Sequence, residues 1–125
     1  MTGRATFARS QRLTLDREYQ AAFRARLRKA KHPLVVFGRS NGLDRPRLGL
    51  SVGRKVGPAV TRNRVKRMIR EAFRLNQGDL PVGIDLVVSV RPHRPLPLRE
   101  YERLLILLAT QINTEHQRRT EKAKG

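Results

Sequence analysis

A long amphipathic segment in the middle of the chain, residues 57–76, constrains the fold more than any other feature. It opens with Gly57 and Pro58, and proline is tolerated at the first helical position, where its missing N–H is not needed. Apolar residues then recur at helical spacing along one face. A helix should therefore run to about Asn76 and end before Gly78, with one side buried. That side comprises Val65, Met68, Ile69, Ala72 and Phe73.

Segments on both sides of this helix predict a small sheet. Residues 34–39 and 47–53 are rich in β-branched or alternating apolar residues, and the turn-forming sequence SNGLDRP lies between them. This pattern predicts a hairpin with one apolar face. Residues 84–90, IDLVVSV, are apolar on both faces, as a central strand would be.

Two further helices complete the expected domain. The first covers about 14–28, with Thr14 as its cap, and the last starts near Arg99 and carries a core-facing apolar stripe. Residues 1–12 are expected to form a flexible basic arm, and the charged tail at about 115–125 is expected to fray. The order of elements predicts one α+β domain over 1–125, in which a small sheet packs against three main helices.

The charge of the chain is strongly one-sided. Its 125 residues hold 28 Lys and Arg against 10 Asp and Glu, which gives a formal net charge of +18. Such an excess favours a partner with many regularly spaced negative charges, such as nucleic acid, and predicts binding that weakens steeply as salt rises. Arginine abundance alone decides little, because it fits a general composition bias as well as selection for bidentate phosphate contacts.

Cations are concentrated on the polar side of the central helix. Those spaced four apart repel one another by roughly a few tenths of a kcal/mol per pair, so helix stability gives no reason to keep them. Only Glu71 opposes them, which favours phosphate binding over an ordinary solvated face. The amide of Asn63 can hydrogen-bond RNA or cap locally. The predicted RNA-binding residues are Arg54, Lys55, Arg62, Asn63, Arg64, Lys66, Arg67, Arg70 and Arg74.

Catalytic alternatives find little support in the sequence. GLSVG, residues 49–53, fits the G-x-S-x-G pattern of a serine nucleophile, and Asp85 and His93 follow in the chain order of a hydrolase triad. Ser51, however, is expected in mid-strand, and the chain is far shorter than a hydrolase sheet requires. The chain has no cysteine, and its three histidines lack the spacing of metal ligands. No catalytic or metal-binding residue is predicted.

Aromatic residues are few, which argues against an extensive base-stacking platform. Tyr19 and Phe23 lie one turn apart on the first expected helix, and Phe37 lies on the first expected strand. All three suit a core, Phe23 most of all, but partly exposed in a groove they would stack on unpaired bases. The small residues from Gly49 onward leave room for nucleic acid or for a packed helix.

One long run of residues is recognisable. RLGLSVGRKVGPAVTRNRVKRMIREAFR, residues 47–74, resembles the signature of the bacterial ribonuclease P protein subunit, and a looser match extends from about Leu13 to Pro92. Its centre is Arg62-Asn63-Arg64, preceded by the LGLSV strand. The resemblance implies a fold like domain 2 of ribosomal protein S5, with a left-handed β-α-β crossover around the basic helix; elongation factor G has a similar domain.

The same resemblance implies a function and its partners. The protein would bind the catalytic RNA of ribonuclease P and the 5′ leader of precursor tRNA, and would promote endonucleolytic removal of the leader. Catalysis would reside in the RNA, with Mg²⁺ bound mainly by that RNA, and the protein alone would be inactive. No protein partner would be required.

Site residues follow from the resemblance as well. The basic helix would face the catalytic RNA, whereas Tyr19, Phe23 and Phe37 would line a leader-binding cleft, with Lys55 nearby. The sequence has no apolar run of membrane-spanning length, so we expect a cytoplasmic protein that binds no membrane. The nearest alternative is a ribosomal or general structured-RNA-binding protein without a role in cleavage.

Overall fold

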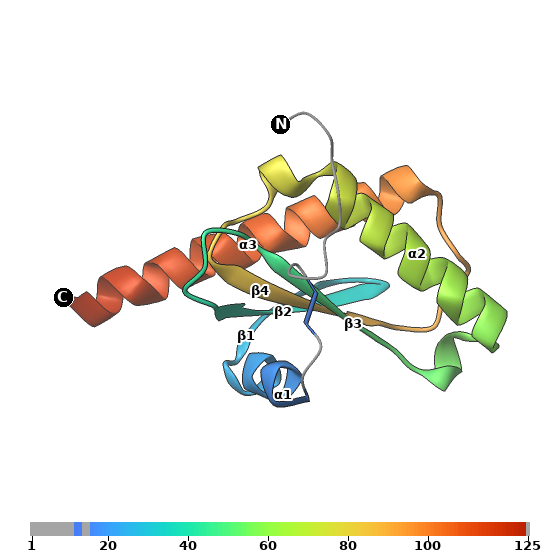
Figure 1. Ribbon diagram of the computed structural model, residues 1–125, viewed down its shortest axis with the longest axis horizontal. Helices are drawn as coiled ribbons and strands as arrows, with labels where there is room; N and C mark the ends of the chain where they lie inside the picture. Colours follow the sequence, from blue (N-terminus) through green and yellow to red (C-terminus); the bar gives the residue numbers. More distant parts are fainter. Residues whose placement is uncertain (1–11, 14–15, 125) are drawn as a thin grey trace.

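A four-stranded mixed sheet carries one helix on one face and two helices on the other (Figure 1). The computed structural model describes residues 12–13 and 16–124. The elements in chain order are α1 (Asp16–Arg24), β1 (Leu27–Lys31), β2 (Leu34–Ser40), β3 (Arg47–Val52), the 3₁₀ turn η2 (Arg54–Val56), α2 (Ala59–Leu75), the 3₁₀ turn η3 (Gln77–Asp79), β4 (Ile84–Val90) and α3 (Leu98–Lys124).

The strand order, β1-β2-β4-β3, differs from the predicted hairpin. β2 pairs antiparallel with β1 and with β4, whereas β3 pairs parallel with β4. The prediction that 34–39 pairs with 47–53 is therefore wrong. The almost wholly buried strand β4 takes the place between them, because its two apolar faces suit the centre of a sheet. The hairpin of this sheet is β1–β2, which turns at His32 and Pro33.

Helix α2 connects the two parallel strands. β3, α2 and β4 form a left-handed β-α-β crossover, the opposite hand from nearly all such connections (Figure 1). The predicted bounds of this central helix, and the α+β fold with three main helices and a small sheet, are confirmed. Within the described residues, no helix combines the length and the apolar character that crossing a membrane requires.

The main core lies between the sheet and helices α2 and α3. Inward-facing residues of β2, β3 and β4 meet the apolar stripes of the two helices there, as the helical spacing predicted. Met68 is only partly buried, but the rest of the predicted α2 face is fully buried. The largest side chains in this core are Tyr101, Phe73, Leu34, Ile69, Ile84, Leu86, Leu105, Leu108 and Ile112.

The predicted first helix ends earlier than expected, its predicted cap Thr14 lies outside the described residues, and the last helix is longer than predicted. α1 ends at Arg24, because Arg26 adopts a positive φ of 57° and residues 27–31 form a strand instead. α3 continues through the tail that was expected to fray, where Glu115 pairs with Arg118 and Arg119 in the manner that supports exposed helices. The predicted arm lies almost wholly outside the described residues.

Candidate nucleic-acid interface

The exposed side of α2 carries most of the predicted RNA-binding residues. Asn63, Arg64 and Arg67 are exposed, whereas Arg62, Lys66 and Arg70 are half-buried. Arg54 and Lys55 are exposed in η2, the 3₁₀ turn just before this helix. The fold therefore brings the predicted cations together on one helix and the turn that leads into it.

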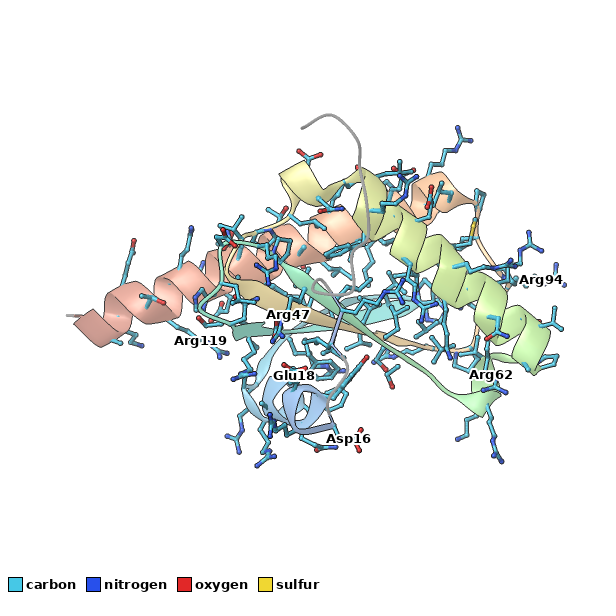
Figure 2. All side chains as sticks on the ribbon, viewed as in Figure 1. Asp16, Glu18, Arg47, Arg62, Arg94 and Arg119 are labelled. Carbon is cyan, nitrogen blue, oxygen red and sulfur yellow. The ribbon has the colours of Figure 1, made fainter. Side chains whose placement is uncertain are left out.

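Two of these cations make contacts within the protein, one at each end of α2. Arg62 Nε donates a hydrogen bond of 3.2 Å to the carbonyl oxygen of Gly57, which fixes the start of α2 (Figure 2). Arg74 pairs with Glu71, and the hydrogen bond from this guanidinium lowers the pKa of the Glu71 carboxyl. Glu71 is the single acid of α2, and Arg74 compensates its negative charge. This pair lies near the C-terminal end of the helix, away from Asn63 and Arg64.

A hollow forms where α2 meets β3 and the start of the described chain. Lys66 and Arg70 line it from α2, and Tyr19 lines it from α1. The remaining lining residues are Arg12, Leu13, Leu48 and Leu50. We call this the junction hollow, because it joins the cationic helix to one of the predicted aromatic residues.

A second hollow lies on the outer surface of α2 and is lined by Val60, Asn63, Arg67 and Arg70. Val60 is 80% exposed, so it adds apolar surface to this otherwise polar hollow. Arg70 borders both hollows, so the cationic surface is continuous from the outer side of α2 to the junction hollow.

The three predicted aromatic residues, which we call the aromatic cluster, lie together between α1 and the sheet. The Phe23 and Phe37 rings meet edge to face with centroids 4.9 Å apart. The Tyr19 hydroxyl donates to the Leu13 carbonyl oxygen at 3.3 Å and accepts from the Leu50 amide at 3.2 Å. All three side chains are half-buried against a small apolar group, so they contribute to packing and keep exposed ring surface.

Gly49 makes this arrangement possible. A Cβ at this position would lie 2.8 Å from a Tyr19 ring atom and 2.9 Å from Leu13. The small residue of β3 therefore accommodates a packed helix, one of the two alternatives that the sequence left open. Gly53 at the end of the same segment has open space around it.

An ionic network anchors α1 to the sheet. Asp85 of β4 is fully buried and accepts two hydrogen bonds of 2.8 Å from Arg47 of β3 and one of 2.8 Å from Asn41. Arg47 also pairs with Glu18 of α1 at 2.9 Å, and Figure 2 shows these two side chains between α1 and β3. The bond to Asp85, followed by smaller contributions from Glu18, raises the pKa of Arg47. Sequence reasoning missed this network, because it weighed Asp85 only as a triad acid and otherwise interpreted IDLVVSV as a strand that is apolar on both faces.

The structure separates the residues of the hydrolase alternative. Ser51 is exposed in β3 and pairs with Ser89 in the neighbouring strand. Asp85 is held by Arg47 and Asn41, and the His93 ring bonds to Tyr101 Oη at 2.7 Å. In the part of the chain that the structure describes, no three His, Asp or Glu side chains gather as they would around a metal ion.

Comparison with known proteins assigns the chain to a family. The family model described as Ribonuclease P matches residues 7–113. The chain belongs to the ribonuclease P protein family. The ribonuclease P protein component of Thermotoga maritima is 42% identical over 99 residues, which cover 79% of this chain and 82% of the relative. That of Brevibacillus brevis is 44% identical over 85 residues, covering 67% of this chain and 68% of the relative.

Solved structures of the family share the fold. The ribonuclease P protein of Thermotoga maritima superposes with a TM-score of 0.72 at 36% identity, over 79% of this chain and 96% of that one. The Staphylococcus aureus protein superposes with a TM-score of 0.70 at 29% identity, over 78% and 91%. The chain is therefore a protein component of ribonuclease P, the metal-dependent ribonucleoprotein endonuclease of tRNA processing, and acts with its RNA subunit and precursor tRNA.

Proposed function

We propose that the exposed side of α2 binds the catalytic RNA of ribonuclease P, and that the aromatic cluster binds the 5′ leader of precursor tRNA. The observation that carries this proposal is the junction hollow. Lys66 and Arg70 of α2 face Tyr19 of the aromatic cluster across it. A leader that leaves the catalytic RNA at α2 would therefore meet stacking surfaces next to phosphate-binding cations.

The two surfaces suit different RNA structures. Guanidinium groups on a helix bind the phosphates of folded RNA, with bidentate geometry and without base recognition. Half-buried aromatic rings stack on unpaired bases, each worth about 1–3 kcal/mol, and a single-stranded leader offers such bases. The arrangement therefore favours a precursor with a leader over mature tRNA.

The protein assists catalysis through charge and position. We place the catalytic Mg²⁺ mainly on the RNA, as the resemblance to the ribonuclease P family implies. When bound there, Mg²⁺ would supply the nucleophile and stabilise charge on the reacting phosphate. Cations of α2 reduce repulsion between RNA phosphates, and Phe23, Phe37 and Tyr19 hold the leader in place. We propose that these steps take place in the cytoplasm.

The first test is cleavage of a 5′-labelled precursor tRNA at low Mg²⁺ by a bacterial ribonuclease P RNA, with and without the protein. We expect strong stimulation at the mature 5′ end and no cleavage by the protein alone. Lack of stimulation, together with tight binding to other structured RNA, would favour a general RNA-binding role.

Variants separate the two surfaces. Replacing Arg64 and Arg67 by Ala should weaken binding to the catalytic RNA. The slope of log K against log salt should also become less negative by about 2, because two phosphate contacts are lost. Replacing Arg99 and Arg103 by Ala is the matched control for lost charge on exposed helix. Phe37→Leu should instead weaken binding of the precursor selectively over mature tRNA. Equal behaviour of the test and control pairs would contradict the assignment of α2.

A further inference from the structure

A second cationic surface lies at the β1 edge of the sheet, the opposite edge from β3, beside which α2 packs. It combines the turn after α1, the outer strand β1 and the last turns of α3. β1 and β3 are the two outermost strands of the sheet, about 14 Å apart at the usual strand spacing. We call this surface the basic edge, and its cations are Arg24, Arg26, Arg28, Lys29, Lys31, Arg118, Arg119 and Lys122.

Direct contacts join the two halves of the basic edge. Arg119 of α3 donates hydrogen bonds to the carbonyl oxygens of Ala25 at 3.3 Å and Arg26 at 3.0 Å (Figure 2). Lys29 of β1 lies 3.9 Å from the carboxylate of Glu115. A hollow between the two elements is lined by Lys29, Thr110, Gln111, Thr114, Glu115 and Arg118. Lys29 of β1, the turn after α1 and the last turns of α3 therefore belong to one surface.

Stability does not account for this concentration of charge. Glu115 and Glu121 are the acids among residues 24–31 and 114–124, and Glu115 already contacts Lys29, Arg118 and Arg119. Lysines on an outer strand protect it from pairing with another chain, but that role needs no cations on a helix. The last turns of α3 are also polar all round, so packing contributes little to them. They lie beyond residue 113, where the family match ends.

The basic edge adjoins the aromatic cluster. The Arg28 guanidinium lies 5.9 Å from the centroid of the Phe37 ring, and Phe37 in turn meets Phe23. β1 pairs with β2, the strand that carries Phe37, with Arg28 directly opposite it. A strand of RNA stacked on these rings would therefore reach cations on both sides, Lys66 and Arg70 toward α2 and Arg28 toward the basic edge.

We propose that the basic edge binds the phosphates of the leader nucleotides that lie farther from the cleavage site than those on the aromatic cluster. This inference rests on the proposed function, in which α2 faces the catalytic RNA. Because the leader starts at that RNA, it passes the junction hollow and the aromatic cluster before it reaches β1. Contact with a flexible backbone through exposed Arg and Lys requires no particular base, so the interaction depends on leader length and not on leader sequence.

The test uses the reconstituted holoenzyme and precursors whose leaders are lengthened one nucleotide at a time. The test variant carries K31Q, R118Q and K122Q, which neutralise exposed cations but keep Arg119 and Lys29 in their contacts. The control variant carries R94Q, R99Q and R103Q, exposed cations near the other end of α3. Both lose the same charge, and circular dichroism establishes that both fold.

We expect the test variant to bind precursors with short leaders as the wild type does, and to lose the gain in affinity from longer leaders. With the longest leader, its plot of log K against log salt should be shallower by about 2, from three contacts with a single strand. The control variant should keep both the gain and the slope.

Three results would overturn the proposal in distinguishable ways. If the test variant keeps the full gain from long leaders, the basic edge does not contact the leader. If it weakens binding of short-leader precursors and mature tRNA equally, the edge contacts the tRNA body or the catalytic RNA instead. If the wild type itself shows no dependence on the leader, the proposed function of the aromatic cluster fails as well.

Discussion

Asp85 offers the sharpest test of how the fold holds its functional surface. Asp85→Ala would remove a fully buried carboxylate and leave Arg47 and Asn41 without their shared acceptor. Removing one partner of a buried ion pair typically costs about 3–5 kcal/mol, because the other charge is left uncompensated. Arg47 keeps its 2.9 Å contact with Glu18, and its side chain is 18% exposed. We therefore expect the lower end of that range, about 3 kcal/mol.

Urea unfolding followed by circular dichroism measures this loss. With an m-value of about 1.5 kcal/mol/M, a loss of about 3 kcal/mol lowers the midpoint by about 2 M. Asp44→Ala is the matched control, since Asp44 is 92% exposed and should change stability by no more than about 0.5 kcal/mol. A midpoint shift for Asp85→Ala as small as that of the control would refute the assigned role of the network.

The double variant Arg47→Met with Asp85→Leu tests whether the lost stability comes from an uncompensated charge or from lost packing. If an uncompensated charge causes the loss, the double variant should be less destabilised than the two single variants predict together. Additive losses would instead assign the effect to packing.

Two further predictions concern Gly49 and Tyr101. Gly49→Ala should destabilise the fold by about 1–3 kcal/mol and weaken precursor binding, because the new methyl group displaces Tyr19. Gly53 has open space around it, so Gly53→Ala should preserve binding. Equal precursor binding by the two variants would contradict this prediction. Burial raises the pKa of Tyr101 above its usual 10.0, so the unfolded chain loses this proton first and the wild type should lose stability as pH rises beyond about 10. Tyr101→Phe should show a shallower alkaline loss in unfolding measured from pH 9 to 12, and an identical slope would count against the burial argument.

Local patterns predicted most helices and strands of this fold but not their partners. The bounds of α2 followed from its apolar spacing and from Pro58, and β4 followed from its unbroken apolar run. The pairing of β2 with β3 was wrong because a turn signal is local, whereas the insertion of β4 depends on residues far along the chain. β1 was missed because only Leu27 of its five residues is buried, so LRKAK shows no alternation.

For the candidate site too, the sequence predicted the residues but not how they come together. The cations of α2 and the three aromatic residues could be chosen from spacing and from the family motif. Their meeting at the junction hollow could not, because it depends on Gly49 and on the anchoring of α1 through Glu18 and Arg47. The apolar composition around Asp85 concealed a charge whose partner lies on another strand.

The position of β4 between β2 and β3 determines when the domain can fold. During synthesis β2 and β3 emerge long before β4, so until residues 84–90 are made neither gains its partner in the middle of the sheet. The early chain holds only the β1–β2 hairpin, and an isolated hairpin is marginally stable in water. Arg119 completes its contacts with Ala25 and Arg26 later still. Folding should therefore be a slow, cooperative event that follows synthesis of nearly the whole chain.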